Sequence, residues 1–294
     1  MIKKTSIFYH LPFLFSLSLT PVTYSVHAEE VASTTDYQTE DFVYKAQNPL
    51  TPIYSIPLKY TYHGGAENGG VSIGSLQPII PVSIGNWNMI NQLSMNFIGT
   101  NGVVNGIAEL PEPYPGSGVS GLGDTNFTSL FSPAKSDNFS WGIGPTFVFP
   151  TDTLWNSIGD RRSRELGSGK YSAGPALMFV TQPKPWTLGL NVKQIWSVFG
   201  SSNRNDVSQM VLQPFINYNL SNGWYMVSDM NMIANWNRDN NQRWTVPVGG
   251  GVGKLFTIGK NAINTRLEGY YNPVRPDLSP EWSANFTFQF LFGK

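Results

Sequence analysis

Cysteine is absent from this 294-residue sequence, and charged residues make up only 13% of it. Without cysteine the chain can form neither a disulfide framework nor a thiolate metal site. After residue 28 no apolar run approaches the roughly 18 residues of a membrane helix, and no long segment shows helical periodicity. Aromatic residues reach 14%, and there are 29 glycines and 21 prolines. Together these features favour an all-β chain.

The first 28 residues have the three parts of a secretory signal peptide. Lys3 and Lys4 give a positive start, an apolar run of about a dozen residues follows, and Val26 to Ala28 is a small-residue exit. We therefore predict cleavage after Ala28 and a mature chain that starts at Glu29. A membrane anchor is disfavoured, because the apolar run is short. It is also interrupted by His10, Pro12 and Pro21.

The mature chain is predicted to be nearly neutral. Removing residues 1–28 takes away two lysines, which leaves 19 − 2 = 17 basic residues against 19 acidic ones. Nucleic-acid binding requires a basic patch or stripe. We therefore expect no nucleic-acid partner.

Strict alternation of apolar and polar residues marks the last third of the chain. From Gln209 to Leu220 one face is apolar and the other is mostly amide, and residues 224–236 repeat this division. Between Phe286 and Phe292 four phenylalanines share a face, opposite Thr287, Gln289 and Leu291. Such a row faces the core of a soluble sandwich or the lipid around a membrane barrel.

The spacing of the turns decides between these two folds. We expect twelve strands, near residues 52–63, 71–84, 87–98, 122–132, 139–149, 171–181, 186–198, 207–220, 224–236, 243–257, 261–271 and 281–292. Short turns alternate with longer loops, of which 99–121 and 150–170 are the longest. Outer-membrane barrels have this alternation, and closure leaves no strand edge in lipid. The sequence thus predicts a transmembrane antiparallel up-and-down β-barrel in a Gram-negative outer membrane.

Tryptophans occur near the predicted strand ends. Four open the strand after a short turn: Trp87, Trp141, Trp186 and Trp224. Four others lie near the opposite ends: Trp196, Trp236, Trp244 and Trp282. Indole rings prefer the headgroup zone of a bilayer, so we predict an aromatic girdle at each membrane interface.

Polar and charged side chains alternate onto the predicted inner face. We predict that the lumen is lined by Asp124, Lys193, Asp229, Arg266, Glu268, Gln213, Asn217, Asn231 and Asn235, with Gln77 and Asn191 beside them. In a water-filled lumen these groups set the ion selectivity. They fit equally well as a hydrogen-bonded plug in a narrow barrel. Both interpretations stay open at this point.

Several segments resemble bacterial exported proteins labelled "neuromedin U". These segments are Ala46–Pro49, Gly121–Phe127, Phe131–Lys135, Trp141–Pro145, Val211–Leu220, Asn222–Tyr225 and Arg243–Lys254. Such proteins are similar to the outer-membrane proteins grouped with the meta-pathway of phenol degradation, often called transporters. The resemblance extends from Gln47 to Phe292. It implies a membrane barrel and kinship with aromatic metabolism, and it brings no substrate and no catalytic residue.

Other chemistries have weaker support. An outer-membrane lipid hydrolase needs a serine and a histidine base, but His63 is the one histidine after residue 28, and spacing nominates no serine partner. The run Gly249–Gly253 lacks the GK[ST] ending of a phosphate loop and is better explained by a bend in a barrel strand. Carboxylates are not clustered at metal-ligand spacing. The basic cluster at 161–165 offers contacts to lipopolysaccharide phosphates or simply a solvated loop.

We therefore predict a signal peptide at 1–28, a polar periplasmic segment or plug at 29–49 and a barrel at 50–294. The leading function is a channel or transporter for small molecules, including hydrophobic or aromatic ones. The alternatives are a closed barrel with a structural or surface-interaction role and, behind it, the lipid hydrolase. Expected partners are outer-membrane lipid, lipopolysaccharide, the barrel assembly machinery and a small solute. We expect no enzyme activity, cofactor or metal.

Overall fold

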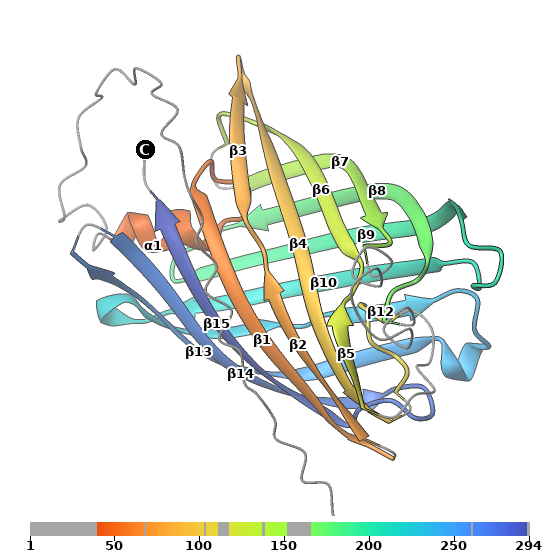
Figure 1. Cartoon of the computed structure of the whole chain (residues 1–294). Helices are drawn as coiled ribbons and strands as arrows, with labels where there is room; N and C mark the ends of the chain where they lie inside the picture. The colour runs from red at the N-terminus through yellow and green to blue at the C-terminus, as the bar shows by residue number, and fades with distance from the viewer. Residues whose placement is uncertain are drawn as a thin grey trace, which may run out of the picture. The chain divides into compact units, whose positions relative to one another are not determined.

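The computed structural model describes residues 40–67, 69–102, 104–110, 118–136, 139–151, 166–259 and 261–292. The predicted signal peptide, residues 29–39 and the basic cluster at 161–165 lie outside the described residues. Within them, tilted strands form a barrel, and a short helix lies at one end (Figure 1). No helix of this described part is long and apolar enough to cross a membrane.

The elements follow one another along the chain in hairpin order. They are α1 (Glu40–Gln47), β1 (Tyr54–Ala66), β2 (Gly69–Leu76), β3 (Ile79–Ile84), β4 (Trp87–Asn101), β5 (Val119–Leu122), β6 (Thr125–Pro133), β7 (Phe139–Phe149), β8 (Lys170–Thr181), β9 (Trp186–Gly200), β10 (Ser208–Asn219), η3 (Ser221–Gly223), β11 (Trp224–Asp229), β12 (Met232–Asn235), η4 (Asn240–Gln242), β13 (Trp244–Ile258), β14 (Asn261–Val274) and β15 (Trp282–Phe292). The bounds lie within a few residues of the predicted strands.

The strands close into a ring in which every neighbour pair is antiparallel. Three pairs of segments, β2/β3, β5/β6 and β11/β12, are two halves of one strand, so the 15 segments make 15 − 3 = 12 strands. The ring closes where β1 pairs with β15, from Tyr54 opposite Phe292 to Gly64 opposite Trp282. The predicted antiparallel barrel of twelve strands is therefore confirmed.

Proline accounts for two of the three strand interruptions. Between β2 and β3, Pro78 has no N–H, and the amide of Gln77 donates to the carbonyl of Pro57 at 2.9 Å. Between β11 and β12, the amide of Met230 donates to the carbonyl of Pro214 at 3.1 Å. A neighbouring strand that presents a proline cannot return the second hydrogen bond of the pair, so the ladder is broken there.

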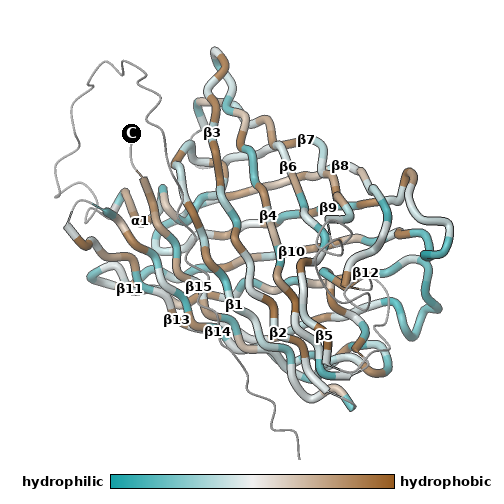
Figure 2. The backbone as a smooth tube through the Cα atoms, in the orientation of Figure 1, coloured by the Kyte–Doolittle hydropathy of each residue, from teal (hydrophilic) through white to brown (hydrophobic). Residues whose placement is uncertain are grey.

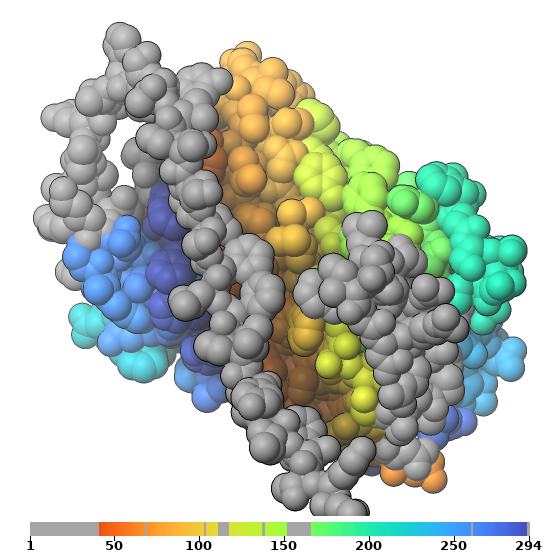
Figure 3. Space-filling view, viewed as in Figure 1, coloured from red at the N-terminus to blue at the C-terminus, as the bar shows by residue number. Residues whose placement is uncertain are grey.

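The barrel wall has apolar side chains on its outer face and polar side chains on its inner face, the reverse of a soluble protein. Large apolar side chains are exposed on the outside, among them Leu267 at 60% and Phe286 at 47%. Polar side chains such as Thr128, Asn191 and Thr287 are buried inside. The tube coloured by hydropathy shows this alternation along the strands, and the space-filling view shows the outer side chains of β3, β4 and β7 as a continuous surface (Figures 2 and 3). An apolar outside with a polar inside matches a barrel surrounded by lipid.

Candidate functional site

The lumen contains a cavity of about 380 Å³. Its wall consists mainly of amide and hydroxyl side chains, with a smaller number of apolar ones. The charged residues that line it are Lys45, Lys59, Glu109, Lys193, Asp229 and Arg266. Parts of two segments outside the strands also line it, residues 45–53 and the pair Ala108 and Glu109. The cavity therefore lies between two pieces of chain that enter the barrel from opposite ends.

Helix α1 lies against the inner wall at the end with the short turns. Asp41 in its first turn and Lys45 in its last turn match the helix dipole. Val43 is buried against Leu255, Ala262 and Leu291 on three successive strands, β13 to β15. These contacts place the apolar side of the helix against the part of the wall that contains the barrel seam.

Polar contacts hold α1 to the other side of the barrel. The Nε2 of Gln47 donates to Oδ1 of Asn219 on β10 at 2.7 Å. The Nε2 of Gln182 donates to the carbonyl of Tyr44 at 2.8 Å, which satisfies a carbonyl near the helix end. Lys184 lies 3.3 Å from Asp41 and 5.1 Å from the Tyr44 ring. The helix is thus fixed to β8–β10 as well as to β13–β15.

The chain between α1 and β1 continues around the inner wall. The Nδ2 of Asn48 donates to Oγ of Ser140 on β7 at 3.2 Å. Leu50 is 4% exposed and packs in a cluster that includes Ile90 and Leu130. Residues 40–53 therefore contact the wall around most of the ring at this end.

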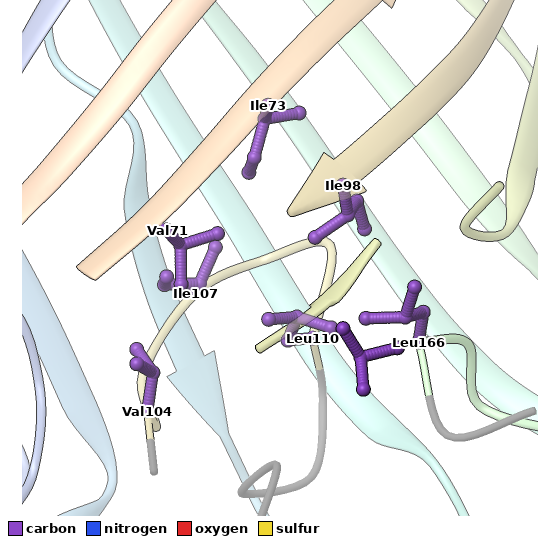
Figure 4. Packing of buried hydrophobic residues seen from close by; sticks show 8 residues of the cluster. Val71, Ile73, Ile98, Val104, Ile107, Leu110 and Leu166 are labelled. Atoms are coloured by element: carbon purple, nitrogen blue, oxygen red, sulfur yellow. The ribbon is translucent and has the colours of Figure 1, made fainter. Parts of the chain in front are cut away.

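The second inserted segment is residues 104–110, from the loop after β4. Val104, Ile107 and Leu110 are buried against the inner face of β2, β4 and β5. In Figure 4 the side chain of Ile107 lies beside Val71, and Leu110 lies near Leu166. This apolar cluster fixes the loop to one side of the barrel.

The same loop reaches the opposite wall through hydrogen bonds. The Nε2 of Gln209 on β10 donates to the carbonyl of Ala108 at 3.2 Å. The Oγ1 of Thr245 on β13 donates to the carbonyl of Gly106 at 3.0 Å. The loop therefore crosses the lumen from β2–β5 to β10–β13. Ala108 and Glu109 also line a second pocket of about 30 Å³, so the loop separates two parts of the interior.

A network of charged side chains covers the wall formed by β10, β11 and β14. Arg266 Nη1 lies 3.3 Å from Oδ2 of Asp229, and Arg266 Nε lies 3.7 Å from Oε2 of Glu268. The Nε2 of Gln213 donates to Oδ1 of Asp229 at 2.8 Å, and the hydroxyl of Tyr270 donates to Oε1 of Glu268 at 2.8 Å. Each carboxylate thus has both an arginine partner and a neutral donor, as buried charges require.

Glycines of β13 make room for this network. Gly249, Gly251 and Gly253 pair with Tyr270, Glu268 and Arg266 in the sheet register. A Cβ at Gly253 would overlap the ring of Tyr225, whose hydroxyl donates to Oδ1 of Asn264 at 2.6 Å. The glycine run therefore serves close packing on the inner face, in keeping with its place in a strand.

Lys59 and Lys193 lie outside this network. They come from β1 and β9, which are six positions apart in the ring of twelve strands and so stand on opposite walls. No hydrogen bond or ion pair holds either ammonium group within the described residues. Burial raises the pKa of the Glu109 carboxyl, against the opposing effects of a backbone hydrogen bond and the positive charge of Lys59. Lys59 thus has an acidic neighbour on the inserted loop.

The structure places most predicted lumen residues on the cavity wall. Those that line it are Lys193, Asp229, Arg266, Gln213, Asn217 and Asn231, together with Gln77 and Asn191. Glu268 lies behind this wall, bonded to Tyr270. Asp124 lines the second pocket, where its Oδ2 accepts two hydrogen bonds from Ser168. Asn235 lies near the long-loop rim, and its Oδ1 accepts from the amide of Asn237.

Sequence reasoning missed Lys59 and Glu109. Lys59 alternates with the exposed Leu58 and Tyr60, and this pattern predicts an inward side chain. Glu109 lies in a loop without periodicity, so its position depends on contacts distant in sequence.

The tryptophans lie on the outer face near the strand ends. Seven of the eight in the predicted girdle are exposed, and Trp244 is half-buried with its ring 5.9 Å from that of Trp236. On the other rim Trp87 and Trp141 are also in edge contact at 5.9 Å. Their role at the membrane interfaces stays a prediction.

His63 and the acidic residues form no further site among the described residues. The His63 side chain has no hydrogen bond to a serine in this part of the chain. The described residues contain no group of three His, Cys, Asp or Glu that could hold a metal ion.

No protein-family model and no curated protein matches the chain. Solved structures do. The crystal structure of an outer membrane channel from Pseudomonas putida F1 has 15% identity and a TM-score of 0.58, covering 82% of this chain and 96% of that chain. The two chains share a fold. A NanC porin structure, with 10% identity and a TM-score of 0.48, covers 82% of this chain and 100% of its own.

Proposed function

We propose that this protein is an outer-membrane channel or transporter for small organic molecules. The observation that carries the proposal is a cavity of about 380 Å³, lined by both polar and apolar side chains, inside a barrel whose outer face is apolar. Small-molecule sites commonly measure roughly 300–1,000 Å³, so the lumen has room for one small solute. The protein of shared fold from Pseudomonas putida F1 is described as an outer membrane channel, which supports the proposal.

An apolar or aromatic body on the solute is part of this proposal. Met178, Phe215 and Ile195 provide apolar contacts within the polar wall. The resemblance to proteins grouped with phenol degradation points the same way. In the cell we expect export by the signal peptide, insertion by the barrel assembly machinery, and loop contacts with lipopolysaccharide.

Residues 40–53 and 104–110 are proposed to control access to the cavity. Each segment reaches across the barrel interior, one at each end. This arrangement gives a chamber with two barriers, in which a solute rests between entry and exit.

Single-channel conductance of the mature protein in a planar bilayer tests the function. Asp229 lines the cavity and is held by Arg266 and Gln213. Asp229→Asn removes one negative charge from the lumen and should shift the ion preference toward anions. Asp239→Asn, in the exposed loop after β12, removes the same charge away from the lumen and serves as the control.

Stable conductance steps support the channel if their ion preference changes in Asp229→Asn but not in Asp239→Asn. Folded protein that gives no conductance, and no uptake of solutes into liposomes, contradicts it. A folded barrel is recognised by its heat-modifiable mobility in gels.

The two inserted segments favour a second candidate, a closed barrel with a structural or surface-interaction role. In that case the loops act and the interior only stabilises the wall. Removing the lumen contacts of residues 104–110 would then leave the barrel non-conducting, whereas a channel would open more often.

We further propose that the protein is not an enzyme. His63 is the remaining candidate base, and its side chain has no serine partner in the described structure. Purified protein should release no fatty acid from phospholipid micelles, and His63→Ala should be the same. Hydrolysis by the wild type that is lost in His63→Ala would overturn this proposal.

A further inference from the structure

Lys193 lines the cavity and has no acidic residue next to it in the sheet. In the sheet register it pairs with Val211 on β10 and Ala176 on β8. Its same-face neighbours on β9 are Asn191 and Ile195. No carboxylate stands beside Lys193 on its own strand or opposite it on either flanking strand.

This isolation distinguishes Lys193 from Arg266 and Lys59, two other cations of the cavity wall. Arg266 forms ion pairs with Asp229 and Glu268. The positive charge of Lys59 interacts with the Glu109 carboxyl. Lys193 is half-buried and has no ion-pair partner within the described residues, so an anionic ligand in the lumen would gain a charge-assisted contact there.

Asn191 provides a second, independent observation. Its side chain is 5% exposed and lines the same cavity. The Nδ2 donates to Oε1 of Gln213 at 3.1 Å, whereas Oδ1 has no hydrogen-bond partner within the described residues. A buried acceptor of this kind fits a ligand that donates a hydrogen bond.

Lys193 and Asn191 are two residues apart on one face of a strand, which separates them by roughly 7 Å. Val211, Ile195 and Met178 supply apolar surface around them. We propose that this part of the lumen is a binding site for small hydroxy acids with an apolar body, such as a hydroxylated benzoate. Lys193 binds the carboxylate and Oδ1 of Asn191 accepts from the hydroxyl.

This inference rests on the proposed function, because it names the solute class of the same lumen. It is tested separately by isothermal titration calorimetry of the mature, folded protein in detergent. The probes are 4-hydroxybenzoate, benzoate and phenol. The wild type should bind 4-hydroxybenzoate most tightly, since phenol lacks the carboxylate and benzoate lacks the hydroxyl.

Two lysine variants test the carboxylate contact. Lys193→Gln should weaken binding of 4-hydroxybenzoate and benzoate by about tenfold or more and leave phenol unchanged. Lys193→Arg should retain most of the affinity. The matched control is Lys254→Gln, which removes a positive charge from the outer face, where Lys254 lies 4.7 Å from the Trp224 ring.

Asn191→Ala tests the hydroxyl contact. It should lower the affinity for 4-hydroxybenzoate to that for benzoate, while benzoate itself binds as before. Equal affinities of the wild type for all three probes would overturn the inference. Equal affinities of Lys193→Gln and Lys254→Gln for 4-hydroxybenzoate would also overturn it. Protein that binds 4-hydroxybenzoate but gives no conductance would support this binding site and contradict the proposed channel. The two proposals can therefore fail separately.

Discussion

At the short-turn end, residues 43–50 pack apolar side chains against both halves of the wall. At the long-loop end, residues 104–110 pack theirs against β2, β4 and β5 and reach the other half through hydrogen bonds. Apolar packing therefore fixes residues 43–50 to both halves of the wall, but fixes residues 104–110 to one half only. Residues 104–110 can therefore separate from β10 and β13 while their apolar cluster stays packed. Residues 43–50 can move only if one of their apolar clusters is disrupted.

Among the substitutions that test this difference between the two segments, Leu50→Ala should have the largest effect. Loss of a buried leucine costs about 2–5 kcal/mol, and Leu50 is 4% exposed. We expect faster amide hydrogen exchange throughout α1 and a lower free energy of unfolding. Leu58→Ala removes the same atoms from the lipid side, where Leu58 is 44% exposed, and should leave α1 exchange unchanged.

The double variant Gln209→Ala with Thr245→Val should have a smaller effect, confined to the loop. Two hydrogen bonds contribute about 1–3 kcal/mol together. Amides of residues 104–110 should exchange faster and channel openings should become more frequent, with α1 unaffected. Thr128→Val, which removes a hydroxyl bonded to Thr146 on the cavity wall, is the matched control. Unchanged exchange in the loop would show that its apolar cluster alone fixes it.

Asp41→Asn should change the N-terminal segment by less than about 1 kcal/mol. Asp41 and Lys184 form an exposed ion pair, and exposed pairs contribute little. Amide exchange in α1 should match that of the wild type at physiological salt. A marked increase would mean that charge, and not packing, holds the helix.

The smallest expected effect concerns the loop after β9. Hydrogen bonding to Lys170, the charge of that lysine and a further hydrogen bond from Ser197 lower the pKa of Asp206. Since the pKa is lowered in the folded state, the contact stabilises the loop above the ordinary aspartate pKa of about 3.9 and is lost as the pH falls through the lower folded value. Protection of the Val207 amide, which donates to Oγ of Ser197, relative to its intrinsic exchange rate should therefore decrease below pH 4. Asp206→Asn should abolish this pH dependence.

The wall of the barrel could be predicted from the sequence because each strand repeats one local rule. Alternation along Gln209–Asn219 and Trp282–Phe292 fixes the inner and outer faces, and turn spacing fixes the number of strands. The two interruptions were not predicted. The one between β11 and β12 lies opposite Pro214 on the neighbouring strand, and the one between β2 and β3 contains Pro78 and lies opposite Pro57.

The contents of the lumen could be predicted only in part. Lys193, Asp229 and Arg266 follow from alternation, whereas α1 and residues 104–110 are short segments whose positions depend on distant contacts. Val104, Ile107 and Leu110 show no strand or helix period, so their burial against Val71 and Ile98 was not visible in the sequence.

The seam between β1 and β15 has a consequence for the order of folding. Tyr54 pairs with Phe292, so the two strands that close the ring come from opposite ends of the described chain. No shorter, growing chain can complete the ring, because its last partner has not yet been made. Such long-range pairing is slow, so until β15 is available the edge of β1 stays unpaired, and the outward phenylalanines need protection from aggregation.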